Sequence, residues 1–240
     1  MNKVNNFLKY NTFESKILKR KCGTLILKHP IKVQDFHELV IDLRDRIFRL
    51  NYDFVTLKIH YHKPIYSDIL REYNFKFIEE LITFYLKRKK KVQTEPVFFK
   101  KDKLKECIKI SKKAFIFDRY HQDKFIGKKM ANDIKTSWIK NSFEYRADKI
   151  FGLENNKIFL ITKKNKNKDI FIDLIAVDVK NQNKGYGRRL IEFMLSHYSE
   201  SKNFYAGTQK NNKSSTIFYK KNNFKVLNKS FTYHWHAKKN

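Results

Sequence analysis

The chain has 240 residues, and its 53 Lys and Arg against 24 Asp and Glu give a formal net charge of +29. This length provides enough core for one large domain or two small ones, and an aromatic content of 15% excludes a disordered chain. The lysines are scattered among asparagines along the whole chain, so we interpret the charge as a compositional bias, and nucleic acid is not the expected partner.

The two cysteines, Cys22 and Cys107, lie far apart and lack the spacing of metal ligands. They predict neither a disulfide framework nor a zinc site, and we expect no metal. The N-terminus has no apolar stretch of signal-peptide length, and no run approaches the roughly 18 apolar residues of a membrane span. We therefore expect a cytoplasmic protein without a membrane partner.

The first half of the sequence predicts alternating strands and helices. The expected elements are a strand at 24–28, a helix at 35–50, a strand at 53–60, a helix at 65–73 and a strand at 75–86. Such a β-α-β-α-β order is typical of a small α/β domain. No internal repeat is apparent, although both halves of the chain share this α/β character.

A basic run, Lys87–Lys91, precedes Thr94-Glu95-Pro96. A solvated charge run that ends at a proline is typical of a link between domains. The sequence therefore predicts a small N-terminal domain over residues 1–95 and a second domain over residues 96–240.

The second half predicts a longer series of elements. It contains helices at 103–114 and 129–141 around a polar segment at 117–123, a hairpin of strands 150–154 and 158–163 turning at Asn155-Asn156, an apolar strand at 169–179, a helix at 186–198, a strand at 204–207, a helix at 212–222 and a strand at 224–235.

The strongest chemical signal lies where the apolar strand ends and the next helix begins. A helix start exposes unpaired backbone N–H groups and the positive end of the helix dipole, which together bind phosphate. Glycines allow a pyrophosphate to approach closely, and Lys184, Arg188 and Arg189 add charge. The alternative is an ordinary turn, and the spacing differs from the Rossmann and P-loop motifs. The segment reads Gln182-Asn183-Lys184-Gly185-Tyr186-Gly187.

This Q-x-x-G-x-G segment resembles the pantetheine-pyrophosphate loop of the GNAT acetyltransferase superfamily. Thr208-Gln209, Asn212, Tyr219 and Asn223-Phe224 are similar to the block that follows in that superfamily, with Asn223 where the family usually has Gly. The resemblance implies a two-domain GNAT-type α/β fold, with a mixed, mostly antiparallel sheet flanked by helices and a smaller N-terminal α/β domain.

The same resemblance implies that acetyl-CoA or another acyl-CoA is the donor and that Asn212 contacts its pantetheine arm. Tyr219 is implied as the general acid for the leaving thiolate, against the alternative of a half-buried aromatic residue. Backbone N–H groups near Ile175 and Val177 are expected to polarise the thioester carbonyl.

The general base is left open. Asp173 interrupts an apolar strand and is either a catalytic carboxylate or a structural ion pair. His121, His234 and an ordered water are the other candidates.

More closely, the chain resembles the TDP-fucosamine acetyltransferase branch, which acylates an amino-deoxysugar on a nucleotide diphosphate. The similar segments are Tyr10–Ser15, Ala114-Phe115 with Arg119-Tyr120, Trp138-Ile139 and Tyr233-His234-Trp235. This branch implies a nucleotide-sugar acceptor, a role in lipopolysaccharide O-antigen biosynthesis and a homodimer.

The expected acceptor residues are Arg119, Tyr120, His121 and Asp123, with Gln209 after the last internal strand. Arg suits phosphate and an aromatic ring suits stacking, although an internal Arg119–Asp123 pair on a surface loop is the alternative. Two other functions stay open: a GNAT that acts on a protein or other small amine, and a basic binding module without turnover.

Overall fold

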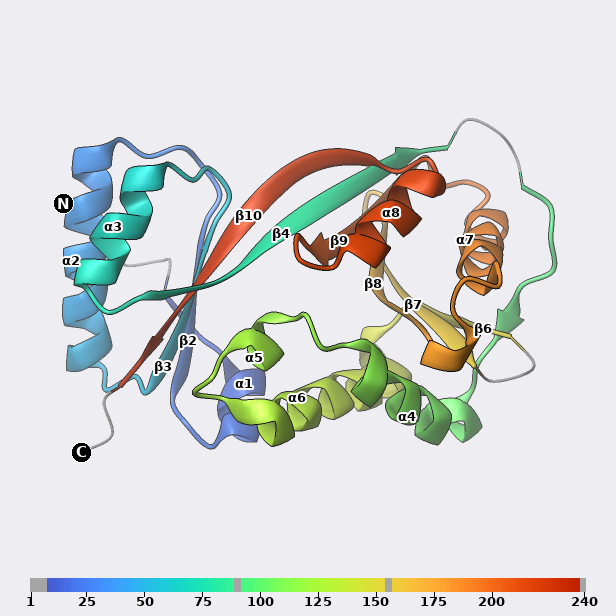
Figure 1. Ribbon diagram of the computed structural model, residues 1–240, viewed down its shortest axis with the longest axis horizontal. Coiled ribbons are helices and arrows are strands. Elements are labelled where there is room, and N and C mark those ends of the chain that lie inside the picture. The colour runs from blue at the N-terminus through green and yellow to red at the C-terminus, as the bar shows by residue number, and fades with distance from the viewer. Residues whose placement is uncertain (1–7, 89–91, 154–156, 238–240) are drawn as a thin grey trace. The chain divides into compact units, whose positions relative to one another are not determined.

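A computed structural model describes residues 8–88, 92–153 and 157–237 (Figure 1). Contacts between Cα atoms divide the chain into two units. The first unit takes in the described residues up to Leu81 together with Arg119–Met130 and those from Asn228 onward, and the second unit takes in Ile82–Asp118 and Ala131–Leu227. The sequence placed its domain boundary after residue 95. That boundary stays a prediction, and Lys89–Lys91 of the expected link lie outside the described residues.

The first unit consists of strands with helices packed against them. Its elements are β1 (Lys9–Tyr10), α1 (Thr12–Leu18), β2 (Cys22–Leu27), α2 (Val33–Arg49), β3 (Phe54–Ile59), α3 (Pro64–Glu72), the start of β4 (Lys76–Lys87), α5 (Arg119–Gln122), the start of α6 (Gly127–Asn141) and most of β10 (Lys225–His236). The strands are ordered β1-β2-β3-β10-β4, with β2 parallel to β3 and β10 antiparallel to β3.

The second unit contains most of the remaining elements. They are the end of β4, β5 (Val97–Phe98), α4 (Leu104–Ala114), the rest of α6, β6 (Lys149–Gly152), β7 (Ile158–Lys164), β8 (Ile170–Val177), α7 (Tyr186–His197), β9 (Asn203–Gln209) and α8 (Lys213–Lys221). The strands are ordered β4-β9-β8-β7-β6-β5, and β8 runs parallel to β9. The expected mixed, mostly antiparallel sheet flanked by helices is confirmed.

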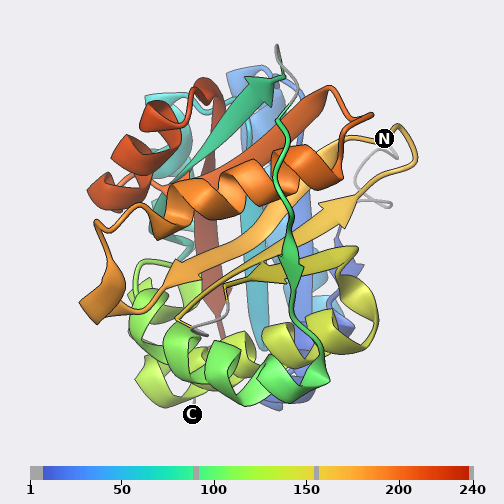
Figure 2. The same cartoon turned by 90° about the vertical axis from the view of Figure 1, so that its right-hand side faces the viewer.

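Apolar side chains at helical and strand spacing build the cores. In the first unit Phe36, Val40, Leu43 and Ile47 of α2 are fully buried against the strands. In the second unit α7 packs on one face of the strands, and α4 and α6 pack on the other (Figure 2). The expected turn at Asn155-Asn156 lies outside the described residues.

The two halves of the chain contain the same series of elements, which sequence inspection did not reveal. A first repeat, β2-α2-β3-α3-β4, matches a second repeat, β8-α7-β9-α8-β10. The starts of β3, α3 and β4 (residues 54, 64 and 76) each lie 149 residues before the starts of β9, α8 and β10 (residues 203, 213 and 225). Both α3 and α8 have nine residues, and both β4 and β10 have twelve.

The end of the second helix shows how closely the repeats agree. Asn74 and Asn223 both adopt a left-handed conformation, with φ of 62° and 63°. Each is followed by a buried Phe whose N–H donates to a carbonyl five residues earlier, at 2.9 Å for Phe75 and 3.0 Å for Phe224. Asn tolerates this conformation better than other side chains, which explains why Asn223 stands where the GNAT superfamily usually has Gly.

The last strands of the repeats are exchanged between the units. β10 of the second repeat pairs with β3 in the first unit, from Phe231 to His236. The end of β4 of the first repeat belongs to the second unit, where Phe84 is fully buried and Tyr85 donates a hydrogen bond to Asn203 of β9 (2.9 Å). Each unit is therefore completed by a strand from the other half of the sequence.

Candidate active site

The loop between β8 and α7 has the form that the sequence predicted. A short 3₁₀ turn, Val179–Asn181, is capped by Asp178, whose carboxylate accepts from the Lys180 N–H (3.1 Å). The chain then passes through two residues with positive φ, Asn183 (62°) and Gly185 (79°), before α7 begins at Tyr186. Residues 182–185 are exposed, so the helix start is open to a ligand.

The two glycines of the loop serve different purposes. Gly185 is the N-cap of α7, and its positive φ is a conformation that side chains with a Cβ rarely adopt. Gly187 is needed for packing, because a Cβ at this position would lie 2.7 Å from the Phe218 ring of α8. The Q-x-x-G-x-G spacing thus combines a tight turn with close contact between two helices.

Positive charge surrounds this helix start. Lys184, Arg188 and Arg189 are all exposed, and only Arg188 has an ion-pair partner among them, Glu192 at 3.0 Å. The N-terminal end of a helix attracts anions because its first N–H groups have no intrahelical partners. Together these groups form a site suited to a pyrophosphate.

The two strands β8 and β9 separate on the side of this loop. β8 and β9 are paired from Ile170–Phe204 to Ile172–Ala206, but β8 continues to Val177 and β9 to Gln209 without further pairs. The separated segment includes Ile175 and Val177, the residues expected to polarise a thioester carbonyl. On the side that faces β9, the main-chain groups of this segment have no strand partner. They are therefore available to hydrogen-bond an extended pantetheine arm.

Asp173 lies at a β-bulge in β8. Ile161 of β7 pairs with Leu174 and Thr162 pairs with Ile172, so Asp173 is the extra residue. The bulge also changes the face toward which the following side chains point: Ile172 packs with α7, whereas Leu174 packs with α4 and α6.

Both carboxylate oxygens of Asp173 are engaged. Arg146 donates to each of them (2.6 and 3.1 Å), Trp138 donates to Oδ2 (2.8 Å), and Lys163 lies 3.3 Å from Oδ1. Of the two roles that the sequence left open, this geometry favours the structural ion pair. Burial and the neighbouring Arg146 lower the pKa of Lys163, an effect that Asp173 opposes.

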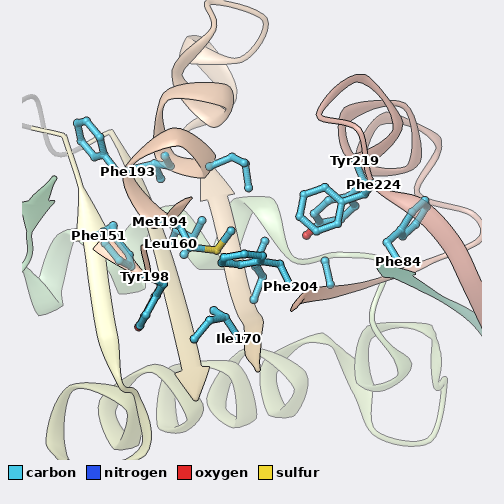
Figure 3. Packing of buried hydrophobic residues seen from close by; sticks show 14 of the residues in the cluster. Phe84, Phe151, Leu160, Ile170, Phe193, Met194, Tyr198, Phe204, Tyr219 and Phe224 are labelled. Carbon is cyan, nitrogen blue, oxygen red and sulfur yellow. The ribbon is translucent and has the colours of Figure 1, made fainter. Parts of the chain in front are cut away.

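Asn212 and Tyr219 both belong to α8. Asn212 is the N-cap, and its side chain accepts from the Ser215 N–H (3.1 Å). Tyr219 is 3% exposed and packs in the core of the second unit, with ring centroids 5.3 Å from Phe84 and 5.4 Å from Phe224. Figure 3 shows its ring beside these two residues with its hydroxyl directed away from α8.

Burial raises the pKa of Tyr219 above its ordinary value. The phenol therefore stays protonated at neutral pH and has a proton to give. This protonation state is the one required of a general acid.

The expected acceptor residues Arg119 and Tyr120 lie in α5 of the first unit, in contact with α1. Arg119 forms an ion pair with Glu14 (2.6 Å), and the Tyr120 hydroxyl donates to the same carboxylate oxygen (2.7 Å). Glu14 is 1% exposed, and Tyr120 is 3% exposed. The proposed internal pair of Arg119 with Asp123 is not formed; Glu14 takes its place.

Asp123 contacts two histidines of β10 instead. Its Oδ2 accepts from His234 Nδ1 (2.6 Å) and from His236 Nε2 (2.7 Å). Burial alone would raise the pKa of Asp123, but these hydrogen bonds hold it well below its usual range. The sequence suggests Asp123 and His234 as separate candidates, and their separation of 111 positions in the chain conceals the contact.

The two remaining candidates are half-buried. His121 lies within α5 of the first unit, and Gln209 is the last residue of β9 in the second unit.

Comparison with known proteins finds a family match within the second half of the chain. Residues 146–226 match the sequence profile of a family described as "Acetyltransferase (GNAT) domain". This segment is about a third of the chain and contains the helix-start loop, Asn212 and Tyr219. GNAT acetyltransferases use acetyl-CoA as the acyl donor, which confirms the expected class of donor. No curated protein matches the chain.

Several solved structures share the fold at very low sequence identity. A functionally unknown conserved protein from Staphylococcus epidermidis is 10% identical, with a TM-score of 0.67 over 97% of this chain and 92% of its own. A GCN5-related N-acetyltransferase from Sphaerobacter thermophilus is 7% identical (TM-score 0.62; 95% and 75% covered). A tandem GNAT protein from the clavulanic acid biosynthesis pathway, without acetyl-CoA, is 8% identical (TM-score 0.57; 91% and 76% covered).

Among the described residues, no helix has the length and apolar character required to cross a membrane.

Proposed function

We propose that this acyl-CoA-dependent N-acyltransferase, which carries a GNAT acetyltransferase domain, transfers an acyl group to the amino group of a nucleotide-linked amino-deoxysugar. Acetyl is the first donor to test. The observation that carries the proposal is the exposed, basic start of α7 beside two separated strands, with Tyr219 on the next helix.

The donor site uses three parts of the second unit. The N–H groups at the start of α7, with Lys184 and Arg189, bind the pyrophosphate of acyl-CoA. The pantetheine arm lies along β8 where β9 has separated from it, and Asn212 borders that arm. Gln182, Asn183, Tyr186, Gly187 and Arg188 complete the loop around the phosphates.

The reaction joins the amine nitrogen to the thioester carbonyl carbon and breaks the carbon–sulfur bond. N–H groups of β8 near Ile175 and Val177 stabilise the oxyanion that forms on the carbonyl oxygen. Tyr219 gives its proton to the departing thiolate. The attacking nitrogen loses one proton to water and the Tyr219 phenolate takes one back from water, so the products are an amide and the free thiol of CoA. Because Asp173 is held by Arg146 and Trp138, we assign it to supporting the bulge and leave base catalysis to an ordered water.

The acceptor is proposed to bind the first unit. A pocket of about 590 Å³ there is lined by Tyr10, Thr12, Ser15, Lys16, Lys19, Arg20, Lys21 and Asp53. Four cations and one aromatic ring suit the phosphates and base of a nucleotide. Several lining residues belong to Tyr10–Ser15, one of the segments that resemble the TDP-fucosamine acetyltransferase branch.

Buried polar groups elsewhere in the first unit also support a sugar acceptor. Glu14 Oε2, Thr56 Oγ1 and Ser230 Oγ are buried in the first unit and have no hydrogen-bond partner. Buried polar atoms of this kind call for water or a ligand, and the hydroxyl and amino groups of a sugar would satisfy them. Arg119, Tyr120, His121, Asp123 and Gln209 remain the proposed acceptor residues, with Arg119 acting through its pair with Glu14.

The test is release of free thiol from acetyl-CoA, with TDP-, GDP- and UDP-linked amino-deoxysugars as acceptors. Release with one acceptor, abolished in Tyr219→Phe while acetyl-CoA still binds, would support the proposal. Silence across the panel by a protein that binds acetyl-CoA would contradict the sugar acceptor and favour another amine. A protein that does not bind acetyl-CoA would contradict the enzyme itself.

A pair of variants tests where the nucleotide binds. Lys16→Ala with Lys19→Ala removes two pocket cations and should raise the KM for the nucleotide sugar several-fold, with the KM for acetyl-CoA unchanged. The control is Lys105→Ala with Lys109→Ala, which removes two exposed lysines of α4 in the second unit. Equal effects in the two proteins would assign the change to net charge alone.

A further inference from the structure

A cluster in the first unit has the composition of a metal site. Asp123, His234 and His236 each present one ligand atom, and these atoms lie within 4.8 Å of one another. Asp123 and His234 are almost fully buried, and the His236 side chain is 10% exposed. Two imidazoles and one carboxylate are a donor set that first-row transition metals prefer, Zn²⁺ among them.

The backbone directs all three side chains to one point. His234 and His236 are two residues apart on β10, so they point to the same face of the strand. Asp123 follows α5, and its second oxygen, Oδ1, accepts from the Phe125 N–H (2.9 Å). That bond fixes the carboxylate so that Oδ2 faces both rings, at 2.6 Å from His234 Nδ1 and 2.7 Å from His236 Nε2.

Aromatic rings pack against the two histidines. The Phe54 ring lies 4.8 Å from each imidazole, and the Phe125 ring lies 5.0 Å from His236. An ion held about 2.0–2.2 Å from N and O ligands would require the carboxylate and rings to move apart only slightly. A largely buried, preoriented set of ligands of this kind binds a metal more tightly than the same residues on a mobile surface.

We propose that Asp123, His234 and His236 bind one first-row divalent transition-metal ion of the Zn²⁺ type. The ion would join the segment after α5 to β10, two parts of the first unit that are far apart in the sequence. Three protein ligands leave a coordination position for water or a ligand. This inference does not depend on the proposed acceptor or on acyl transfer.

One neighbour must adjust. Arg20 Nη1 lies 3.5 Å from His236 Nδ1, and a ring that binds a metal through Nε2 carries a proton on Nδ1. The guanidinium would then have to turn away, at some cost to metal affinity. Removing it by Arg20→Gln is therefore expected to tighten metal binding.

The test is titration of the untagged, metal-free full chain with Co²⁺, followed by visible absorption, and with Zn²⁺, followed by thermal unfolding. We expect one Co²⁺ per chain, an absorption band of a low-symmetry site and a higher Tm with Zn²⁺. Mg²⁺ and Ca²⁺, which prefer oxygen ligands, should give neither. His236→Asn should lose both responses, and His29→Asn, an exposed histidine of the same unit, should keep them.

A wild-type chain that neither binds Co²⁺ nor rises in Tm with Zn²⁺ would overturn the proposal and leave the cluster as a hydrogen-bonded clamp. Metal binding that survives in His236→Asn would overturn it as well, since the ion would then lie elsewhere. If His236→Asn fails to fold, Asp123→Asn provides the second variant. Its single amide oxygen can still accept from both histidines, at the loss of the bond from the Phe125 N–H, but its metal affinity should fall at least tenfold without the negative charge.

Discussion

In the first repeat β2 leads into α2 at Lys32 and Val33, whereas in the second repeat β8 leads into α7 through a loop with two positive-φ residues. The N-cap Lys32 is extended and makes no side-chain bond, and Asp35 lies in the first turn of α2. An acidic residue there repels the anions that a helix start otherwise attracts. The same framework therefore has an exposed, basic helix start in the second repeat, where we propose the phosphate site, and an acidic first turn at the corresponding helix of the first repeat.

The second helices of the repeats differ in the same way. At the positions of Asn212 and Tyr219 in α8, α3 and its N-cap have Lys63 and the fully buried Leu70. Lys63 makes no capping bond, and Leu70 has no proton to give. The shared framework thus accounts for the fold, and the residues that differ at its strand–helix junctions are those to which we assign the chemistry.

The largest expected effect comes from separating the repeats at the predicted domain boundary. A fragment of residues 96–240 lacks β4, whose Phe84 is fully buried beside Tyr219. It also lacks β3, the partner of β10. Loss of a buried Phe alone costs about 3–5 kcal/mol. We therefore expect the fragment to be unfolded, as measured by its circular dichroism spectrum.

Addition of residues 1–95 to that fragment should restore structure, because each piece completes the other. A cooperative unfolding transition and acetyl-CoA binding by residues 96–240 alone would contradict the exchange of strands and support independent domains.

Tyr219→Phe removes the proposed proton donor and should lower kcat by about 10²–10⁴-fold, the range for general acid catalysis. The Kd for acetyl-CoA should change little, because the ring stays in place. The matched variant is Leu70→Met in the first repeat, which should leave kcat unchanged. Steady-state thiol release measures both, and equal kcat values for wild type and Tyr219→Phe would contradict the assignment.

The pH dependence of kcat gives an independent check. Because burial raises the pKa of Tyr219 above its ordinary value of about 10, the phenol should remain protonated through pH 9. The kcat of the wild type should therefore show no decline due to this group between pH 7 and 9. If kcat of the wild type falls between pH 7 and 9 and kcat of Tyr219→Phe does not, Tyr219 ionises in that interval. That result would contradict the proposed role.

Gly185→Ala tests the phosphate loop. A Cβ at φ 79° costs about 1–2 kcal/mol, and distortion of the helix start should weaken acetyl-CoA binding about tenfold. Lys32→Ala changes the corresponding helix start in the first repeat and should leave binding unaffected. Isothermal titration calorimetry compares the two variants, and equal losses of affinity would show that the repeats do not differ as proposed.

Asn212→Ala should have the smallest effect on stability. Its side chain caps α8 by accepting from the Ser215 N–H, and loss of such a cap costs about 1 kcal/mol. Lys63→Ala, at the N-cap of α3, removes no capping bond and should be neutral. Urea unfolding distinguishes them, and a neutral Asn212→Ala would show that the cap contributes nothing to stability.

Local patterns explain why much of the site could be predicted from the sequence. The Gln182–Gly187 loop lies at a strand-to-helix junction that hydrophobic periodicity alone defines, and Tyr219 lies a fixed distance beyond it on an amphipathic helix. The order of strands and helices followed from the same periodicity. The short α1 was not expected, because its seven residues are too few to show a helical stripe.

Contacts between distant residues could not be predicted. Arg146 and Trp138 engage Asp173 across 27 and 35 residues, and the bulge that positions the carboxylate depends on the register with β7. The repeat is equally hidden: at the end of their second helices the repeats share the short sequence Asn-Phe-Lys, at 74–76 and 223–225. A common fold requires matching burial, which many different side chains satisfy.

The donor site is tested by calorimetric titration of the wild-type chain with acetyl-CoA, repeated with Lys184→Glu and Arg189→Glu combined. We expect one acetyl-CoA per chain, and we expect the double variant to lose binding because like charges now repel the pyrophosphate. Two acetyl-CoA per chain, or undiminished binding by the variant, would contradict the claim that only the second repeat carries the donor site.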